Sequence, residues 1–269
     1  MLLPPWQPDW KALMAAAPQL EVPPGEGRVY LLADSHLGHG DARPGEFIAQ
    51  LRGLQDARLV ILLGDLFKVW LSPRKFWDAQ AREVMEALHG LAADGLPLWL
   101  VVGNREFFLP RGPRRAARDA LPFAQIIHDM ATFTLGGRRY ALTHGDVVNR
   151  RDAQYLKWRR IARSRPFEWC FRAMPAPLAR AIARRLEGSL ANTNRAIKIQ
   201  YPEDELRAFA HAVLTAEGGP PPDGCLIGHF HRDALLTLPD GRWLRIVPDW
   251  LEGRKLLALN EAGEMELVG

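Results

Sequence analysis

Cysteine is scarce in this chain of 269 residues, which contains only Cys170 and Cys225. Two cysteines cannot build the disulfide framework of a small secreted domain, so nothing in the sequence indicates an oxidising compartment. Long apolar runs are also missing: the longest, such as Leu59–Leu63, span about five residues, whereas a transmembrane helix needs about twenty. The N-terminus lacks the basic start and apolar stretch of a secretory signal. We therefore expect a soluble, cytoplasmic protein.

Acidic residues are too few to balance the basic ones in one segment. The formal net charge is +4, and between residues 150 and 185 only Asp152 and Glu168 oppose eleven cationic side chains. These are Arg150, Arg151, Lys157, Arg159, Arg160, Arg163, Arg165, Arg172, Arg180, Arg184 and Arg185. Such a patch suits a nucleic acid, an anionic lipid or a phosphorylated ligand, and the charge alone favours none of the three.

Short apolar runs of the buried-strand type recur along the chain and are followed by polar turns. They are Val29–Ala33, Leu59–Leu63, Leu98–Val102, Tyr140–Thr143 and Cys225–Ile227. A helical pattern at Phe76–Ala93 separates two of them, and a strand-rich end follows at Leu235–Leu267. Alternating strands and helices predict an α/β layered fold.

The same pass along the chain predicts three parts. Residues 1–28 read as an N-terminal appendage, with a short amphipathic helix and a Pro-rich link, that packs on the body. Residues 29–150 and 217–269 form the core. Residues 151–216 are basic and helical, and we expect them to be an insertion that caps the core.

Chemistry-bearing side chains follow every one of the five apolar runs. In chain order they are Asp34, His36, Asp65, Asn104, His144, His229 and His231. In open α/β sheets, ligand sites form outside the carboxyl ends of the strands, so we expect these seven side chains to share one rim. Each motif alone is commonplace, since a single histidine is more often structural than a ligand, but their joint occurrence after five strands is far harder to produce by accident.

Two carboxylates, one amide and four imidazoles are too many ligands for one tetrahedral zinc. They suit two divalent ions, about 3.5–4 Å apart, that share a bridging carboxylate. Oxygen and imidazole donors without thiolate favour Mn²⁺, Fe²⁺, Mg²⁺ or Zn²⁺ over soft metals. The predicted cofactor is therefore a pair of divalent cations, with Mn²⁺ as the first choice.

The ordered motifs Asp34-x-His36, Gly64-Asp65, Gly103-Asn104, His144-Gly145-Asp146 and Gly228-His229-x-His231 resemble the calcineurin-like metallophosphoesterase superfamily. The resemblance implies a two-sheet sandwich flanked by helices, here with an inserted helical cap. It further implies one metal held by Asp34, His36, Asp65 and His231, and a second held by Asp65, Asn104, His144 and His229. Asp65 would bridge the two ions.

Arg105 stands where most of the superfamily has a histidine that assists the leaving group. A guanidinium cannot release a proton near neutral pH, but it can clamp phosphate oxygens and neutralise developing charge. Chemistry without a proton donor suits a leaving group that departs as a stable anion. A phosphate monoester, with a second pKa of about 6, is such a group, so we expect cleavage of a pyrophosphate linkage.

Gly103-Asn104-Arg105 followed by an acidic residue is similar to the UDP-2,3-diacylglucosamine hydrolases of lipid A synthesis. The resemblance implies catalytic roles for Asn104, Arg105 and His144. It also implies substrate contacts from Arg105, Asp152, Tyr155, Asn192 and Arg195. This chain departs from that pattern in four places: Glu106 replaces the usual Asp, Arg195 replaces Lys, Val247-Pro248-Asp249-Trp250 replaces an aromatic-His pair, and the N-terminal appendage differs.

The basic cap then predicts a cleft for acyl chains beneath a cationic surface that meets an anionic inner membrane, with peripheral rather than transmembrane attachment. No nucleic acid is expected, since no recognised nucleic-acid module accompanies the charge. Two alternatives stay open at this point. One is another metallophosphoesterase, such as a nucleotide pyrophosphatase or phosphodiesterase, and the other is a non-catalytic interaction scaffold on the same fold.

Overall fold

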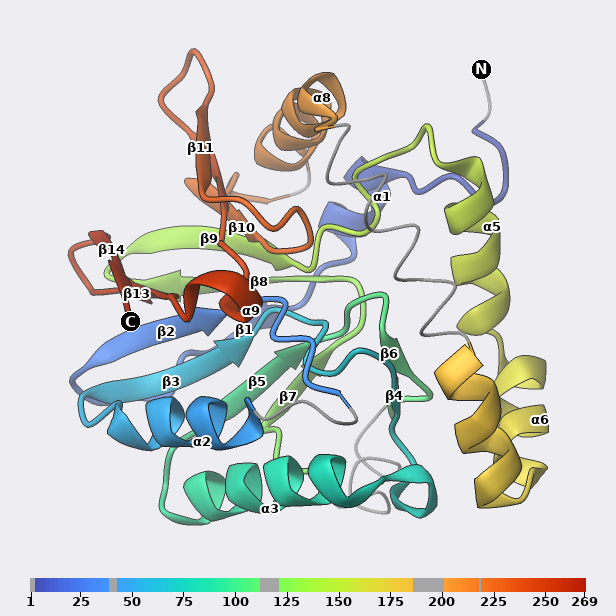
Figure 1. Ribbon diagram of the computed structural model, residues 1–269. Coiled ribbons are helices and arrows are strands. Elements are labelled where there is room, and N and C mark those ends of the chain that lie inside the picture. The colour runs from blue at the N-terminus through green and yellow to red at the C-terminus, as the bar shows by residue number, and fades with distance from the viewer. Residues whose placement is uncertain (1–2, 39–42, 112–120, 186–200, 218) are drawn as a thin grey trace.

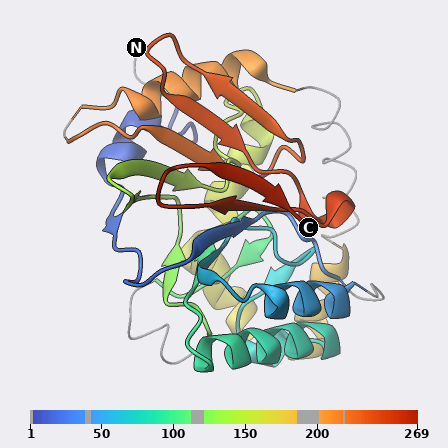
Figure 2. The same ribbon diagram turned by 90° about the vertical axis from the view of Figure 1, so that its left-hand side faces the viewer.

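Two six-stranded sheets pack face to face, and helices cover the outer face of each (Figure 1). The computed structural model describes residues 3–38, 43–111, 121–185, 201–217 and 219–269. Turned by 90°, the chain shows the layers stacked as helix, sheet, sheet and helix (Figure 2). The α/β sandwich predicted from the sequence is confirmed.

The first sheet has the strand order β14-β13-β2-β3-β5-β7. Its strands are β2 (Arg28–Leu32), β3 (Ala57–Leu62), β5 (Leu98–Val101), β7 (Gln125–Ile127), β13 (Leu256–Leu259) and β14 (Met265–Val268). Strands β2, β3, β5 and β7 run parallel, and β13 pairs antiparallel with β2. The parallel strands therefore all end at the same edge of the sheet.

The second sheet has the order β1-β8-β9-β10-β12-β11. Its strands are β1 (Gln19–Leu20), β8 (Met130–Leu135), β9 (Arg138–Thr143), β10 (Gly224–Ile227), β11 (Ala234–Thr237) and β12 (Trp243–Ile246). Strands β9, β10 and β12 are parallel to one another, whereas β8 and β11 run antiparallel to their neighbours β9 and β12. All five predicted strands are present in these two sheets, with boundaries within three residues of the prediction.

The period of two along a strand divides its side chains between two cores. On β2, Val29 and Leu31 belong to the cluster between the sheets, while Tyr30 and Leu32 belong to the cluster under the helices. Because both faces of the central strands are buried, those strands are continuously apolar, which is the pattern that the sequence shows.

Two pairs of helices cover the outer faces. Helices α2 (Pro44–Gly53) and α3 (Ala79–Ala93) pack on the first sheet, and α1 (Trp10–Ala15) and α8 (Glu203–Leu214) pack on the second. The Asp78 carboxylate caps α3 by accepting a hydrogen bond from the Ala81 N–H, at 2.9 Å. The short helix α9 (Trp250–Gly253) leads into β13.

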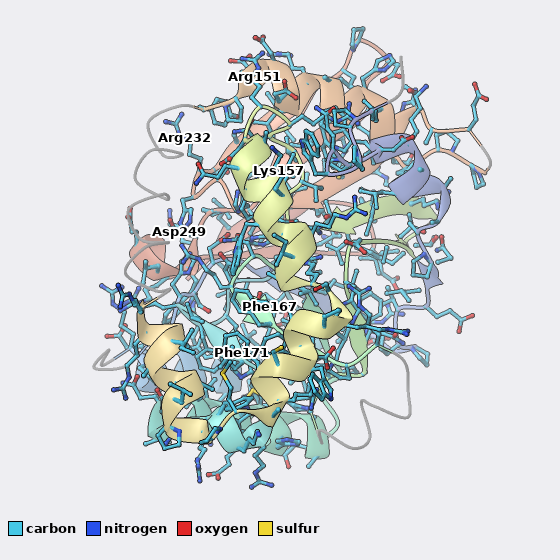
Figure 3. The ribbon with its side chains drawn as sticks, turned by 90° about the vertical axis from the view of Figure 1, so that its right-hand side faces the viewer. Arg151, Lys157, Phe167, Phe171, Arg232 and Asp249 are labelled. Carbon is cyan, nitrogen blue, oxygen red and sulfur yellow. The ribbon has the colours of Figure 1, made fainter. Side chains whose placement is uncertain are left out.

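The cap helices form a separate group on one side of the sandwich, at the right in Figure 1 and facing the viewer in Figure 3. Its described parts are α5 (Ala153–Ala162), α6 (Arg165–Ala173) and a helical stretch at 176–185. They pack on β4 (Trp70–Leu71), the 3₁₀ turn η1 (Arg74–Phe76) and β6 (Glu106–Phe107), a contact centred on Phe108 and Phe171, whose rings lie 5.2 Å apart.

Two predicted boundaries need correction. The cap was expected to extend to residue 216, but α8 packs on the second sheet through Leu206, Phe209 and Val213, which are fully buried there. The appendage at residues 1–28 packs on the body as expected, yet it also supplies β1, which pairs with β8 in the second sheet. Both differences arise because tertiary contacts, rather than local composition, assign these segments to the core. Within the described residues, no helix is both long and apolar enough to cross a membrane.

Candidate metal centre

The carboxyl ends of the parallel strands from both sheets meet along one edge of the sandwich, and the seven predicted ligand residues lie there. Asp34 and His36 follow β2, Asp65 follows β3, Asn104 follows β5, His144 follows β9, and His229 and His231 follow β10. Asp34, His36, Asp65 and His144 are buried and the other three are half-buried, although all seven carry polar or ionisable side chains. The first sheet thus supplies four of these residues and the second sheet three.

The backbone is strained at this edge. Asp34, His36, Asp65, His229 and His231 all have positive φ angles, between 45° and 69°. A left-handed conformation costs a residue with a Cβ about 1–2 kcal/mol. Such strain persists only where the surrounding structure enforces it, and it concentrates at functional sites. Five strained positions among seven candidate ligands mark this edge as a site rather than an ordinary set of strand ends.

Three of the side chains form a first group of potential ligands. One ligand atom each from Asp34, His36 and His231 lies within 4.8 Å of the others. The Nε2 atoms of His36 and His231 are 3.4 Å apart, and they lie 3.8 Å and 3.9 Å from Asp34 Oδ1. Two donors bound at about 2.1 Å to one ion lie roughly 3.0–3.4 Å apart, or somewhat more in an open geometry, so the spacing fits a shared cation.

The other side chains form a second group around His144. Its Nε2 lies 3.0 Å from Asn104 Oδ1 and 3.2 Å from His229 Nδ1. Asp65 faces both groups, because its Oδ2 is 3.9 Å from His36 Nε2 and its Oδ1 is 3.6 Å from His144 Nε2. A carboxylate in that position is able to bridge two cations.

One buried carboxylate oxygen, Oδ1 of Asp34, has no hydrogen-bond donor among the described residues. A buried carboxylate oxygen without a partner is costly, because burial removes its hydration without replacing it. A divalent cation between Asp34 and the two imidazoles of His36 and His231 would satisfy it. The donor set therefore fits a metal.

The protonation of the imidazoles also suits ligation. Burial, together with the facing rings of His231 and His144 respectively, lowers the pKa of His36 and of His229 well below the ordinary histidine value. Both rings are therefore neutral, the form that binds metals. Burial also lowers the pKa of His144, but the carboxylates of Asp65 and Asp34 outweigh it and raise that pKa to about 9. A cation bound at His144 must displace this proton.

Arg105 is buried at the same edge. Its backbone N–H donates to Asp65 Oδ1 at 2.9 Å, and its Nε lies 3.7 Å from Asp65 Oδ2. The guanidinium therefore faces the side chain that can bridge the two groups. Its predicted contact with substrate phosphate stays a prediction.

Glu106 and Asp249 contact candidate ligand residues, although we did not predict site roles for them. The Glu106 carboxylate accepts hydrogen bonds from the backbone N–H groups of Asp65 and Leu66, at 3.0 Å and 2.8 Å, and so fixes the loop that carries Asp65. Asp249 accepts from His231 Nδ1 at 2.8 Å. Asp249 lies three residues beyond the end of β12, so a search for polar residues shortly after strands would have found it.

Two further predicted substrate contacts, Asp152 and Tyr155, form hydrogen bonds within the protein. Asp152 caps α5, accepting from the Tyr155 N–H at 2.8 Å, and the Tyr155 hydroxyl donates to Asp146 Oδ2 at 2.5 Å. These contacts give both residues a structural role and leave their substrate contacts as predictions. Asn192 and Arg195 lie outside the described residues.

The chain belongs to the calcineurin-like phosphoesterase family, whose family model matches residues 27–233. Its relatives include UDP-2,3-diacylglucosamine hydrolases. That of Ralstonia nicotianae is 32% identical over 239 residues, covering 83% of this chain and 84% of the relative. That of Chromohalobacter salexigens is 32% identical over 231 residues, covering 83% of this chain and 89% of the relative. That of Pseudomonas entomophila is 28% identical over 247 residues, covering 87% and 96%.

Proposed function

We propose that this protein hydrolyses the pyrophosphate bond of UDP-2,3-diacylglucosamine to UMP and 2,3-diacylglucosamine 1-phosphate. The observation that carries the proposal is the convergence of seven ligand-type side chains beside Arg105, where a proton donor would otherwise stand. The similarity to UDP-2,3-diacylglucosamine hydrolases over most of both chains supports the choice of substrate.

The two groups of side chains would hold two divalent cations, Mn²⁺ by preference. Asp34, His36 and His231 would hold one, Asn104, His144 and His229 the other, and Asp65 would bridge them. Such a pair lowers the pKa of a water molecule and clamps phosphoryl oxygens.

The residues of this chain then account for the bond that breaks. Water attacks the α-phosphorus, the bond to the bridging oxygen breaks, and UMP keeps the new oxygen. The leaving 2,3-diacylglucosamine 1-phosphate departs as a phosphate monoester anion and needs no proton from the protein. The Arg105 guanidinium neutralises charge that develops on the phosphoryl oxygens, and a rigid cation already in place costs no reorganisation.

A cavity beneath the cap offers a place for an acyl chain. It lies between the β4 segment and the helical stretch at 176–185, and Leu71 and Phe76 contribute apolar lining. Leu37, the residue after His36, also lines it, so the cavity lies close to the metal centre. Lys68 and Arg180 add positive charge, which suits a ligand that is apolar at one end and phosphorylated at the other.

The outer face of the cap supports peripheral attachment to the inner membrane. Each cap helix exposes one large apolar side chain: Ile161 is 54% exposed, Trp169 73% and Leu178 52%. Cationic side chains share these helices, among them Lys157 on α5 (Figure 3). Exposed apolar groups set among cations are the pattern of a helix that lies on an anionic lipid surface.

The decisive experiment incubates the purified protein with Mn²⁺ and UDP-2,3-diacylglucosamine and follows UMP release. We expect release by the wild type and none by Asp65→Ala, which should lose bound metal and activity together. Arg105→His restores a proton donor. If that variant cleaves the pyrophosphate faster than the wild type, the role proposed for Arg105 is wrong. Turnover of nucleotide diphosphates or nucleic acid in preference to the lipid would assign a different substrate.

A further inference from the structure

Residues 4–10 pass beside helix α5 of the cap and lie outside the segment that the family model matches (Figure 1). They are nevertheless firmly bound to the body. Trp10 is only 3% exposed, and its ring packs edge-on against Phe209 of α8, with the centroids 5.5 Å apart. This N-terminal segment is thus part of the folded structure, although it lies outside the segment that the family model matches.

The segment holds the loop that follows His144. The Trp10 indole Nε1–H donates to the Val147 carbonyl at 3.0 Å, and Val147 lies three residues beyond His144. Arg150, at the far end of the loop, stacks on the same indole with its guanidinium carbon 3.4 Å from the ring centroid. Arg150 Nη2 also donates to the Pro8 carbonyl at 2.6 Å. The loop is therefore attached to the segment near both of its ends.

The segment also holds the first cap helix. Arg160 on α5 donates from Nη1 to the Pro5 carbonyl at 2.5 Å, and the Lys157 ammonium lies 4.4 Å from the Trp6 ring centroid. Elsewhere on α5, Arg159 Nε donates to Asp146 Oδ2 at 2.7 Å. Helix α5 is therefore fastened both to residues 5–6 and to the loop beyond His144.

We infer that residues 4–10 are a strap that fixes the cap relative to the metal centre, with Trp10 and Arg150 as its positioning residues. The inference rests on the proposed function, because it assigns the strap to the binding of a large lipid substrate. Helix α5 begins one residue after Asp152 and contains Tyr155. A loosened strap would let helix α5 move, which weakens binding of a substrate that reaches the cap. A small diester that contacts only the metal centre would be unaffected.

The test uses the full chain with Trp10→Phe and Arg150→Met, alone and combined. Trp10→Phe keeps an aromatic ring but removes the donor to Val147. Gln19→Ala is the matched control, because Gln19 ties the N-terminal region to Thr134 of β8 and none of its hydrogen bonds reaches α5 or the loop. In the combined variant we expect amide hydrogen exchange in residues 144–163 to become about fivefold to tenfold faster than in the wild type.

The kinetic expectation is a split between KM and kcat. KM for UDP-2,3-diacylglucosamine should rise about threefold to tenfold with kcat within about twofold, while kcat/KM for bis(4-nitrophenyl) phosphate stays unchanged. Arg150→Lys keeps a cation over the Trp10 indole. Its KM for UDP-2,3-diacylglucosamine should therefore rise much less than that of Arg150→Met.

Two results would contradict the inference that residues 4–10 fix the cap. One is unchanged exchange in residues 144–163, and the other is faster exchange spread evenly over both sheets, which would mean a general loss of stability. If the wild type does not hydrolyse UDP-2,3-diacylglucosamine at all, the proposed function fails. The exchange comparison, with small-diester turnover as a check on the metal centre, would still decide whether the strap holds the cap.

Discussion

Asp249 fixes the orientation of the His231 ring. Its Oδ2 accepts a hydrogen bond from His231 Nδ1 at 2.8 Å, which leaves Nε2 facing Asp34 Oδ1, 3.9 Å away. A carboxylate behind a ligating histidine sets the tautomer and makes the ring a better donor to metal. Asp249 belongs to Val247-Pro248-Asp249-Trp250, where the sequence predicts a departure from the related hydrolases, yet it contacts the predicted ligand His231.

Asp249→Asn should weaken metal binding about 10- to 100-fold, because the neutral amide no longer favours the required tautomer. Titration of the metal-free protein with Mn²⁺ measures the change. Asp240→Asn is the control, since Asp240 lies on an exposed turn and pairs with Arg242. Equal Mn²⁺ affinity in Asp249→Asn and the wild type would contradict the assigned role.

Metal binding should depend on pH through His144. In the absence of metal its pKa is raised to about 9, so the ring carries a proton at neutral pH that the incoming cation displaces. Affinity for Mn²⁺ should therefore rise with pH, by up to about tenfold per unit below pH 9, and level off above it. Calorimetric titrations in buffers of different ionisation enthalpy count the released protons. Release of none near pH 7 would refute this coupling.

Filling the cavity under the cap should exclude the acyl chain. Ala183 lines that cavity, and Ala183→Trp would occupy it with an indole. We expect KM for UDP-2,3-diacylglucosamine to rise at least about tenfold, because a methylene excluded from an apolar site costs roughly 0.8 kcal/mol and several would be lost. Turnover of bis(4-nitrophenyl) phosphate serves as the control. If Ala183→Trp left the KM for UDP-2,3-diacylglucosamine unchanged, its acyl chains would not bind in this cavity.

Membrane attachment should depend on the exposed cap side chains. Trp169→Ser should reduce co-sedimentation with vesicles of anionic phospholipid several-fold, since it removes the most exposed large apolar group in the part of the cap that the structure describes. Leu235→Ser is a matched control, because Leu235 is 50% exposed but belongs to β11 of the second sheet. If Trp169→Ser and Leu235→Ser reduced co-sedimentation with the vesicles equally, membrane attachment would not be a property of the cap.

The sequence predicted the features that depend on local pattern. Runs such as Leu59–Leu63 are continuously apolar because both faces of their strands are buried, and the residue after each run lies at the shared edge. Strand β1 was missed because two residues carry no periodicity. Helix α8 was assigned to the cap because its amphipathic pattern does not say which apolar surface it meets.

The supporting residues of the site were harder to predict. Glu106 was noted only as a departure from a motif, since its role depends on backbone N–H groups about forty residues earlier in the chain. Asp249 acts on His231, eighteen residues away, through a contact between the ends of two strands. Such relationships appear only once the two sheets are packed together.

The division of the ligands between the sheets has a consequence for assembly. Asp34, His36, Asp65 and Asn104 leave the first sheet, whereas His144, His229 and His231 leave the second. Neither sheet alone presents a full set of ligands for either proposed cation, so tight retention of metal would require the two sheets to have packed together. Each bound cation would in turn link the two sheets reversibly. Its uptake would therefore report that the sheets have packed together.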